Sequence, residues 1–340
     1  MRVTITRRTL KLRAPMMTSY GPPLRHRELL ELRIEDADGV PGRGEAAPLE
    51  PYDGVSAERA LTALEAYREA LEDGDDLRGG ALLDACREID ELPQALAAVD
   101  LALWDRAGRR AGRPVAALLS DDALSHVAVN ATIAAGDRAG AAASAAAARG
   151  AGFACVKLKV GIGDDAGRVA AVRAALGPEI ALRLDANGAW TVSEAVRAIE
   201  SLAAAGLELV EEPVHGLTAT RELRERVATR IAIDETAAEA GALASGAADA
   251  VCLKLGRCGG IYGLLASATL VRASGCEPYV ASTLDGPLGI AAALHAAAAL
   301  RITTACGLAT LELFEDVGEH HLAPREGRIA VPRGPGLMGS

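Results

Sequence analysis

The chain has 340 residues, 50% of them hydrophobic, and such a chain buries a large core in two domains or in one barrel with an appended domain. Its formal charge of −10 and its 3% of aromatic residues exclude the basic stripe and the stacking platforms that nucleic-acid binding uses. The first ten residues lack the apolar run of a signal peptide. The most apolar stretch, residues 287–300, is too short to cross a bilayer. We therefore expect a cytoplasmic protein with no nucleic-acid or membrane partner.

The N-terminal part of the chain has the pattern of an α+β domain. Apolar and polar residues alternate with a period of two at residues 3–5 and 30–35, which is typical of half-buried strands. The turn signals ADG (37–39) and GRG (42–44) indicate an antiparallel meander. Helical segments are predicted at residues 57–70 and from Pro93 through DLALWDRAGRR.

After about residue 124, short apolar runs alternate with Ala-rich helical segments about eight times. The runs are HVAVNATI, FACVKLKV, IALRLDAN, LELVEEP, IAIDET, DAVCLKLG, EPYVAST and ITTACGL. Ser193 is placed to cap one of the helices between them. Repeated strand–helix units imply a parallel sheet, and a count near eight favours closure into a (β/α)8-type barrel, so the fold class is α/β.

Each central run ends in a charged or polar residue, and the carboxyl ends of all the strands of a parallel barrel meet at one mouth. Three of these residues, Asp185, Glu211 and Asp234, either cap the helices that follow them or gather at a common point. Three carboxylates without a cation would repel one another, and one would be forced to protonate. Oxygen-only ligands favour Mg²⁺ over Zn²⁺, with Mn²⁺ as a possible substitute.

Two lysines interrupt the run FACVKLKV. Strand alternation places Lys157 and Lys159 on one face, which is either an exposed edge or the inside of the barrel mouth. In the mouth, burial and a nearby Mg²⁺ would depress the pKa of a lysine and make it usable as a base. Lys254 ends a run four strands further round. Two lysines on opposite sides of a metal-held carboxylate suit the removal of a proton next to that carboxylate.

The motifs KLK, LDANGAW, VEEP, AIDET and CLKLGRCGGI together resemble the enolase superfamily, specifically its muconate lactonizing enzyme subgroup. The resemblance implies that Asp185, Glu211 and Asp234 bind the metal. It also implies that Lys159 is the general base, that Lys157 tunes the pKa of Lys159, and that Lys254 is the opposing lysine.

The resemblance covers nearly the whole chain and divides it into three parts. It implies a capping domain with mobile substrate loops at residues 1–120 and a modified TIM barrel at residues 121–311. A tail at residues 312–340 is expected to pack back on the capping domain. Barrels of this kind often associate, so we also expect a homo-oligomer.

The reaction is less closely defined, because members of this subgroup share the metal and the lysines. Dipeptide epimerases of the subgroup resemble one another in an Asp-x-Asp after the eighth strand, where this chain has ACGLATLELF. That stretch is instead similar to the GLxTLxL of o-succinylbenzoate synthases, as ASTLDGPLG resembles their seventh loop. We therefore expect dehydration of a small carboxylate to o-succinylbenzoate, in menaquinone biosynthesis. N-succinylamino acid racemase, muconate cycloisomerase and dipeptide epimerase remain alternatives, as does a metal-free binding protein.

The remaining candidates surround the mouth, and each has an alternative structural role. Ser282 and Thr283 either bind a succinyl carboxylate or ketone or bond to the backbone. The segment TSYGPPLRHR (18–27) is either an ordinary connection or a lid that excludes water. The candidate substrate-binding residues are Tyr20, Tyr52, Asn187, Ser282, Thr283 and Asp285. His295 and the six cysteines are interpreted chiefly as core residues.

Overall fold

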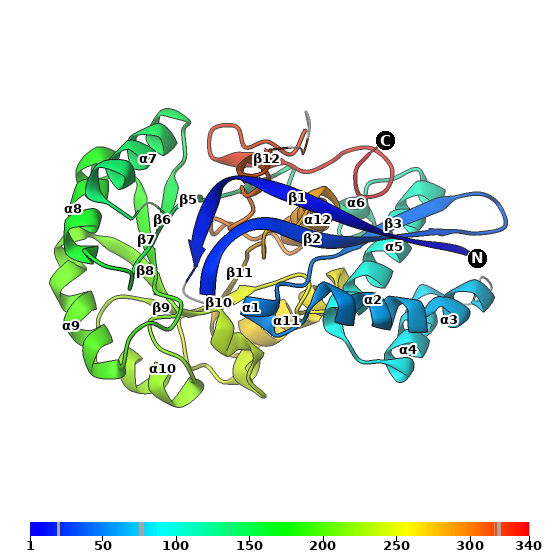
Figure 1. Ribbon diagram of the computed structural model, residues 1–340, viewed down its shortest axis with the longest axis horizontal. Helices are drawn as coiled ribbons and strands as arrows, with labels where there is room; N and C mark the ends of the chain where they lie inside the picture. Colours follow the sequence, from blue (N-terminus) through cyan, green and yellow to red (C-terminus); the bar gives the residue numbers. More distant parts are fainter. Residues whose placement is uncertain (19–20, 75–77, 135, 316, 318–320, 340) are drawn as a thin grey trace.

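The computed structural model describes residues 1–18, 21–74, 78–134, 136–315, 317 and 321–339. An N-terminal α+β domain lies beside a barrel of parallel strands, and this confirms the predicted fold class (Figure 1). Among the described residues, every helix is too short or too polar to span a bilayer.

The capping domain begins with a three-stranded antiparallel sheet of order β1-β2-β3. Its strands are β1 (Arg2–Thr18), β2 (Gly21–Glu35) and β3 (Pro41–Ala46). The predicted turn at residues 37–39 is present between β2 and β3. The prediction of a turn at residues 42–44 is wrong, because this GRG lies inside β3 and its glycines face helix α5 (Pro93–Ala111).

The described part of this domain also contains α1 (Glu50–Asp53), α2 (Ala57–Ala66), α3 (Arg68–Asp73), α4 (Gly79–Ile89) and α6 (Val115–Leu119). The helical segment predicted at residues 57–70 consists of two helices, α2 and α3, which meet at Tyr67. Leu64 and Leu71 are fully buried in one apolar cluster with the β2 residues Leu30 and Leu32. Burial of this apolar surface stabilises the packing of the helices against the sheet.

The barrel contains seven hydrogen-bonded parallel strands in the order β5 to β11. They are β5 (Ala131–Ile133), β6 (Cys155–Lys159), β7 (Ala181–Asp185), β8 (Leu207–Glu211), β9 (Ile231–Ile233), β10 (Ala250–Leu253) and β11 (Glu277–Val280). Residues 306–307 occupy the eighth position, because Cys306 pairs with Val129 and Gly307 pairs with Ala281. These bridges join β11 to the chain that enters β5, and they close the sheet.

Helices cover most of the outer side of the barrel (Figure 1). They are α7 (Arg138–Gly150), α8 (Asp165–Leu176), α9 (Val192–Leu202), α10 (Leu217–Arg224), α11 (Ile261–Ala273) and α12 (Pro287–Ala299), with the short turn η1 (Ala203–Ala205) after α9. The prediction that Ser193 caps α9 is wrong by two residues. Thr191 is the N-cap and forms a capping box with Glu194, which satisfies two backbone N–H groups reciprocally.

The connection between β9 and β10 contains no α-helix. It consists of two short 3₁₀ turns, η2 (Glu235–Ala238) and η3 (Ala242–Ala244). These turns cover less of the strands than a full helix would, because each is no more than four residues long.

The hairpin of β1 and β2 reaches from the capping domain to the mouth of the barrel (Figure 1). Residues 21–27, which were expected to form a connection or a lid, belong to β2, and Leu24 pairs with Met16 of β1. Tyr20 lies outside the described residues. The part of the segment that is described is therefore a strand end placed over the mouth.

The C-terminal residues contact both domains through η4 (Leu311–Leu313), β12 (Arg328–Ala330) and the backbone near Leu337. Strand β12 pairs with β4 (His126–Ala128) of the barrel, and Phe314 pairs with Leu12 of β1. The Leu337 N–H donates to Asp105 Oδ1 of α5 at 2.8 Å.

His295 of α12 is fully buried and holds this C-terminal segment. Its Nδ1 accepts from the Ala116 N–H at 3.0 Å, so its Nε2 carries the proton and donates to the Leu337 carbonyl at 2.9 Å. Burial lowers the pKa of His295 to about 4. The imidazole is therefore a neutral structural residue, as the sequence analysis expects.

Substitution of Gly44 tests the close contact between β3 and α5. A Cβ at Gly44 would lie 1.9 Å from the carbonyl oxygen of Ala98. Gly44→Ala is expected to lower the free energy of unfolding by about 2 kcal/mol or more, because the strand must lift off the helix. Gly80→Ala in α4 is the control, since nothing lies within 4 Å of the added Cβ. Denaturant unfolding measures both, and equal stabilities would contradict the contact.

The neutral His295 predicts an acid-dependent loss of stability. The unfolded state binds a proton to this residue near pH 6.5 and the folded state only near pH 4, so the free energy of unfolding falls as pH falls through this window, by about 1 kcal/mol per pH unit. His295→Gln is expected to flatten this slope in denaturant unfolding between pH 7 and 4. His215→Gln is the control, because Glu212 raises the pKa of His215 and the stabilisation from that histidine is lost as pH rises. A His295→Gln protein with the wild-type slope would refute the assignment.

Candidate active site

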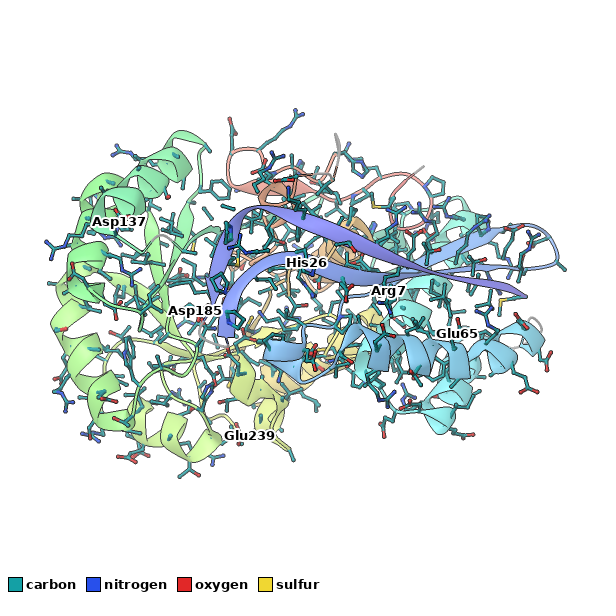
Figure 2. All side chains as sticks on the ribbon, viewed as in Figure 1. Arg7, His26, Glu65, Asp137, Asp185 and Glu239 are labelled. Carbon is teal, nitrogen blue, oxygen red and sulfur yellow. The ribbon has the colours of Figure 1, made fainter. Side chains whose placement is uncertain are left out.

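Three acidic residues meet at the barrel mouth because they end adjacent parallel strands. Asp185 is the last residue of β7 and pairs in register with Glu211, the last residue of β8, while Asp234 directly follows β9. The three are 1%, 0% and 3% exposed. Figure 2 shows Asp185 at the inner side of the barrel, facing the arched end of the hairpin. The structure therefore brings together the three acids that the sequence analysis singles out.

The three lysines form ion pairs with these acids. Lys157 Nζ lies 2.8 Å from Glu211 Oε1 and 2.9 Å from Asp185 Oδ2. Lys159 Nζ lies 2.7 Å from Asp185 Oδ2. Lys254 Nζ lies 3.0 Å from Asp234 Oδ2. Lys159 and Lys254 lie four strands apart in the sheet order and line the same cavity, so they are placed on two sides of it.

The lysines determine how the acids ionise. Burial by itself would raise the pKa of Asp185, but Lys157 and Lys159 hold the pKa below its usual range. The pKa of Asp234 is likewise lowered, because Lys254 and the hydrogen bond from the Tyr52 hydroxyl outweigh the effect of burial. Burial, together with the two neighbouring acids, raises the pKa of Glu211 despite Lys157.

The protein's own charges do not depress the pKa of Lys157 or Lys254. Burial lowers both values, but Asp185 and Glu211 raise the pKa of Lys157, and Asp234 raises that of Lys254, to well above the ordinary range. A depressed pKa at these two lysines would require the charge of a cation in the same cluster.

A second group of residues fixes the carboxylates. Tyr279 of β11 donates to Glu211 Oε2 at 2.7 Å, and Tyr52 of the capping domain donates to Asp234 Oδ1 at 2.6 Å. Arg257 donates to the Tyr52 oxygen at 2.6 Å. Sequence reasoning missed Tyr279 and Arg257, although a lone tyrosine in the run EPYVAST was a usable signal. Tyr52, expected to bind substrate, is thus also a direct support of Asp234.

Two strand-end residues adopt positive φ angles close to the acids. Glu212 has φ 39° and its buried carboxylate accepts from the backbone N–H groups of Asp234 and Thr236. Asn187 has φ 46°, accepts from Lys159 Nζ at 2.7 Å and donates to Glu235 Oε1 at 2.9 Å. Such a conformation costs about 1 kcal/mol, and these hydrogen bonds offset it. Asn187 therefore orients Lys159 and does not line the pocket.

The pocket above the acids has a volume of about 110 Å³. Among the predicted residues, Tyr52, Ser282 and Thr283 line it together with the lysines, Asp185 and Asp234. Asp285 does not line it, because this residue is buried and accepts from the Thr283 hydroxyl at 2.8 Å. The residues that sequence reasoning missed are mainly small or apolar: Met16, Pro22, Leu24, Leu49, Pro51, Thr132, Ala281, Leu284, Gly307, Thr310 and Leu313.

The donor set fits a hard divalent cation. Asp185, Glu211 and Asp234 offer only oxygen atoms, which are the ligands that Mg²⁺ prefers. Their burial leaves their mutual repulsion largely unscreened, and the three lysines already neutralise part of it.

Comparison with known proteins identifies the family. Residues 1–120 match the model described as "Mandelate racemase / muconate lactonizing enzyme, N-terminal domain", and residues 140–338 match "Enolase C-terminal domain-like". The chain belongs to the enolase superfamily, in its muconate lactonizing enzyme subgroup. It is therefore an enzyme of a superfamily that contains lyases, isomerases and racemases.

Relatives within the subgroup differ in their reactions. The chain is 32% identical over 287 residues to a hydrophobic dipeptide epimerase of Enterococcus faecalis, covering 82% of this chain and 81% of that protein. It is 43% identical over 178 residues to an o-succinylbenzoate synthase of Mycobacterium tuberculosis, and this match covers 51% of this chain and 53% of that protein. The structure is similar to that of a dipeptide epimerase from Enterococcus faecalis complexed with Mg and the dipeptide L-Leu-L-Tyr. The TM-score is 0.92 at 28% identity, and the match covers 99% of this chain and 98% of that chain.

Removal of one carboxylate tests the metal centre. Asp185→Asn is expected to weaken Mg²⁺ binding by at least about tenfold, since changes to the partners of metal ligands alone cost about 10–100-fold. Isothermal titration calorimetry with Mg²⁺ measures this directly. Glu208→Gln is the matched control, because Glu208 pairs with Arg183 near the start of β8, away from the mouth. Unchanged affinity in Asp185→Asn would remove this residue from the site.

Proposed function

We propose that the protein is a Mg²⁺-dependent enzyme that removes a proton alpha to a carboxylate, and that its reaction is the dehydration that forms o-succinylbenzoate. The observation that carries this choice is the composition of the pocket. Apart from Asp185 and Asp234, which belong to the proposed metal centre, the described lining contains no carboxylate. A substrate with an ammonium group, such as a dipeptide, would be bound with that charge unpaired, which costs several kcal/mol.

The sequence supports the same choice. At the end of the barrel, where dipeptide epimerases of the subgroup are expected to carry Asp-x-Asp, the chain has ACGLATLELF (305–314), a stretch without aspartate. Gly307 lines the pocket directly. The identity to o-succinylbenzoate synthases is also higher over the matched half of the chain than the identity to the dipeptide epimerase over its longer match.

Ser282 is suited to bind the succinyl group of this substrate. Its Oγ accepts from the Asp285 N–H at 2.8 Å and from the Thr310 hydroxyl at 3.1 Å. A hydroxyl rotates to suit its partner, so when Thr310 donates to Ser282 the Ser282 O–H can donate to a carboxylate or ketone in the pocket. The Thr283 proton is already donated to Asp285, so Thr283 contributes an oxygen rather than a donor.

The lysines perform the proton transfers in this proposal. Lys159, held by Asp185 and Asn187, accepts the proton alpha to the substrate carboxylate. A Mg²⁺ ion held by Asp185, Glu211 and Asp234 would supply Lewis-acid stabilisation of negative charge on that carboxylate. Lys159 then returns its proton to the departing hydroxide, so that water leaves and the ring becomes aromatic. Lys254 stays protonated beside Asp234 and adds positive charge.

N-succinylamino acid racemisation is a second candidate that the same pocket favours. Such substrates also lack an ammonium group, and the protein resembles an N-succinyl Arg/Lys racemase from Bacillus cereus with a TM-score of 0.91 at 27% identity. In that reaction Lys254 would exchange a proton on the second face, whereas dehydration requires only its charge.

A substrate panel with lysine variants tests the proposal. The wild-type protein is assayed with the hydroxylated cyclohexadiene precursor, N-succinyl amino acids, dipeptides and cis,cis-muconate. Dehydration is expected to dominate, and Lys159→Ala is expected to lower its kcat by about 10²–10⁴-fold, the usual contribution of a general base. Lys11→Ala is the control, because Lys11 is the one lysine of the sequence outside the site.

Proton exchange in D₂O separates the two candidates. In a racemase, Lys254→Ala abolishes racemisation but leaves exchange on the Lys159 face. A protein that turned over dipeptides faster than the precursor would overturn the proposed specificity.

A further inference from the structure

A cysteine lies beside two of the acids at the mouth. The carboxylate oxygens of Glu211 and Asp234 and the Sγ atom of Cys252 all lie within 4.8 Å of one another. The three residues come from β8, the residue after β9, and β10, and each is at most 3% exposed. Cys252 is two residues before Lys254, so strand alternation points both side chains to the same face.

The thiol of Cys252 has no hydrogen-bond partner in the described part of the chain. Three other buried cysteines differ in this respect: Cys155 donates to Glu208, Cys276 to the Ala248 carbonyl, and Cys306 to the Thr304 carbonyl. The Cys252 thiol interacts electrostatically with four charged residues: Asp234, Lys254, Glu211 and Lys157. A purely structural core cysteine needs no such surroundings.

A second cavity leads to this cysteine from outside the barrel. It has a volume of about 680 Å³ and is lined by Cys252, Tyr52, Asp234 and Lys254, together with residues of the capping domain, η2 and η3. The short turns between β9 and β10 leave this space, where a full helix would fill it. Small ions therefore have a route to Cys252 that does not pass through the substrate pocket.

We propose that Glu211, Asp234 and Cys252 form a mixed oxygen–sulfur site for a thiophilic divalent cation such as Zn²⁺, Cd²⁺ or Co²⁺. Zinc binds sulfur at about 2.3 Å and carboxylate oxygen at about 2.0–2.2 Å in a tetrahedron, so its ligands lie about 3.5 Å apart. The three donor atoms need to move by only about 1 Å to meet that geometry. Binding releases the thiol proton to solvent.

This site overlaps the proposed Mg²⁺ site but differs from it in one ligand. Mg²⁺ prefers oxygen atoms and takes Asp185 with Glu211 and Asp234, whereas a thiophilic ion takes Cys252 in place of Asp185. Because two acids are shared, the two ions exclude each other. A thiophilic ion therefore inhibits the Mg²⁺-dependent enzyme in competition with Mg²⁺, whichever substrate the enzyme uses.

Titration of the metal-free protein with Co²⁺ tests the site without an activity assay. Thiolate coordination to Co²⁺ gives a sulfur-to-metal charge-transfer band in the near ultraviolet. The wild-type protein is expected to show this band, and excess Mg²⁺ is expected to abolish it. Cys252→Ser is expected to lose the band and to bind Zn²⁺ at least about tenfold more weakly, with its Mg²⁺ affinity changed by less than about twofold.

Two further variants serve as controls for this titration. Cys258→Ser, which alters another cysteine that lines the outer cavity, is expected to keep the band. Asp185→Asn is expected to weaken Mg²⁺ binding and to keep the band. Circular dichroism checks that each variant is folded, and Cys252→Ala replaces Cys252→Ser if the serine variant is not. Absence of the band in the wild-type protein, its persistence in the Cys252 variant, or its insensitivity to Mg²⁺ would overturn the proposal.

Discussion

The active site depends on one electrostatic constraint: three carboxylates are buried at the ends of three adjacent strands, where water cannot screen their repulsion. Lysines hold the pKa values of Asp185 and Asp234 below their usual range despite burial, whereas the pKa of Glu211 stays raised. Lys157 and Lys254 supply part of the compensation, and in return their pKa values rise. A divalent ion at the same point would relieve the acids and free the lysines for proton transfer. In the proposed mechanism, metal binding and base strength would therefore both follow from this charge cluster.

The capping domain participates in this cluster rather than only covering it. Tyr52 donates to Asp234, so the α1 segment contacts a proposed metal ligand directly. Two capping-domain acids also bind helix N-termini of the barrel: Asp100 accepts from the Ile261 N–H of α11, and Glu45 from the Gly286 N–H at the start of α12. Those helices directly follow the loops that carry Lys254 and Ser282, so domain docking positions residues on both sides of the pocket.

Lysine usage reflects the chemistry of the site. Of the 36 lysines and arginines in the chain, four are lysines, and three of these lie at the barrel mouth. Elsewhere the chain uses arginine, which makes better bidentate ion pairs but does not release its proton. An amine that exchanges protons is needed only where the proposed reaction occurs. The described pocket lining has no carboxylate beyond Asp185 and Asp234, and this supports the proposal of a substrate without a positive charge.

The sequence by itself determined the barrel, the three acids and the three lysines, because strand alternation and the common direction of parallel strands place Asp185 and Lys159 at one mouth whatever the packing details. Tertiary structure decided the roles that depend on distant neighbours. The glycines at residues 42–44 resembled a turn but allow β3 to contact α5, and only the folded structure shows that Asn187 accepts from Lys159 and Asp285 from Thr283. Tyr279 and Cys252 reach the acids across the curved inner face of the sheet, and Arg257 reaches Tyr52 through the docking of the capping domain, which no local pattern encodes.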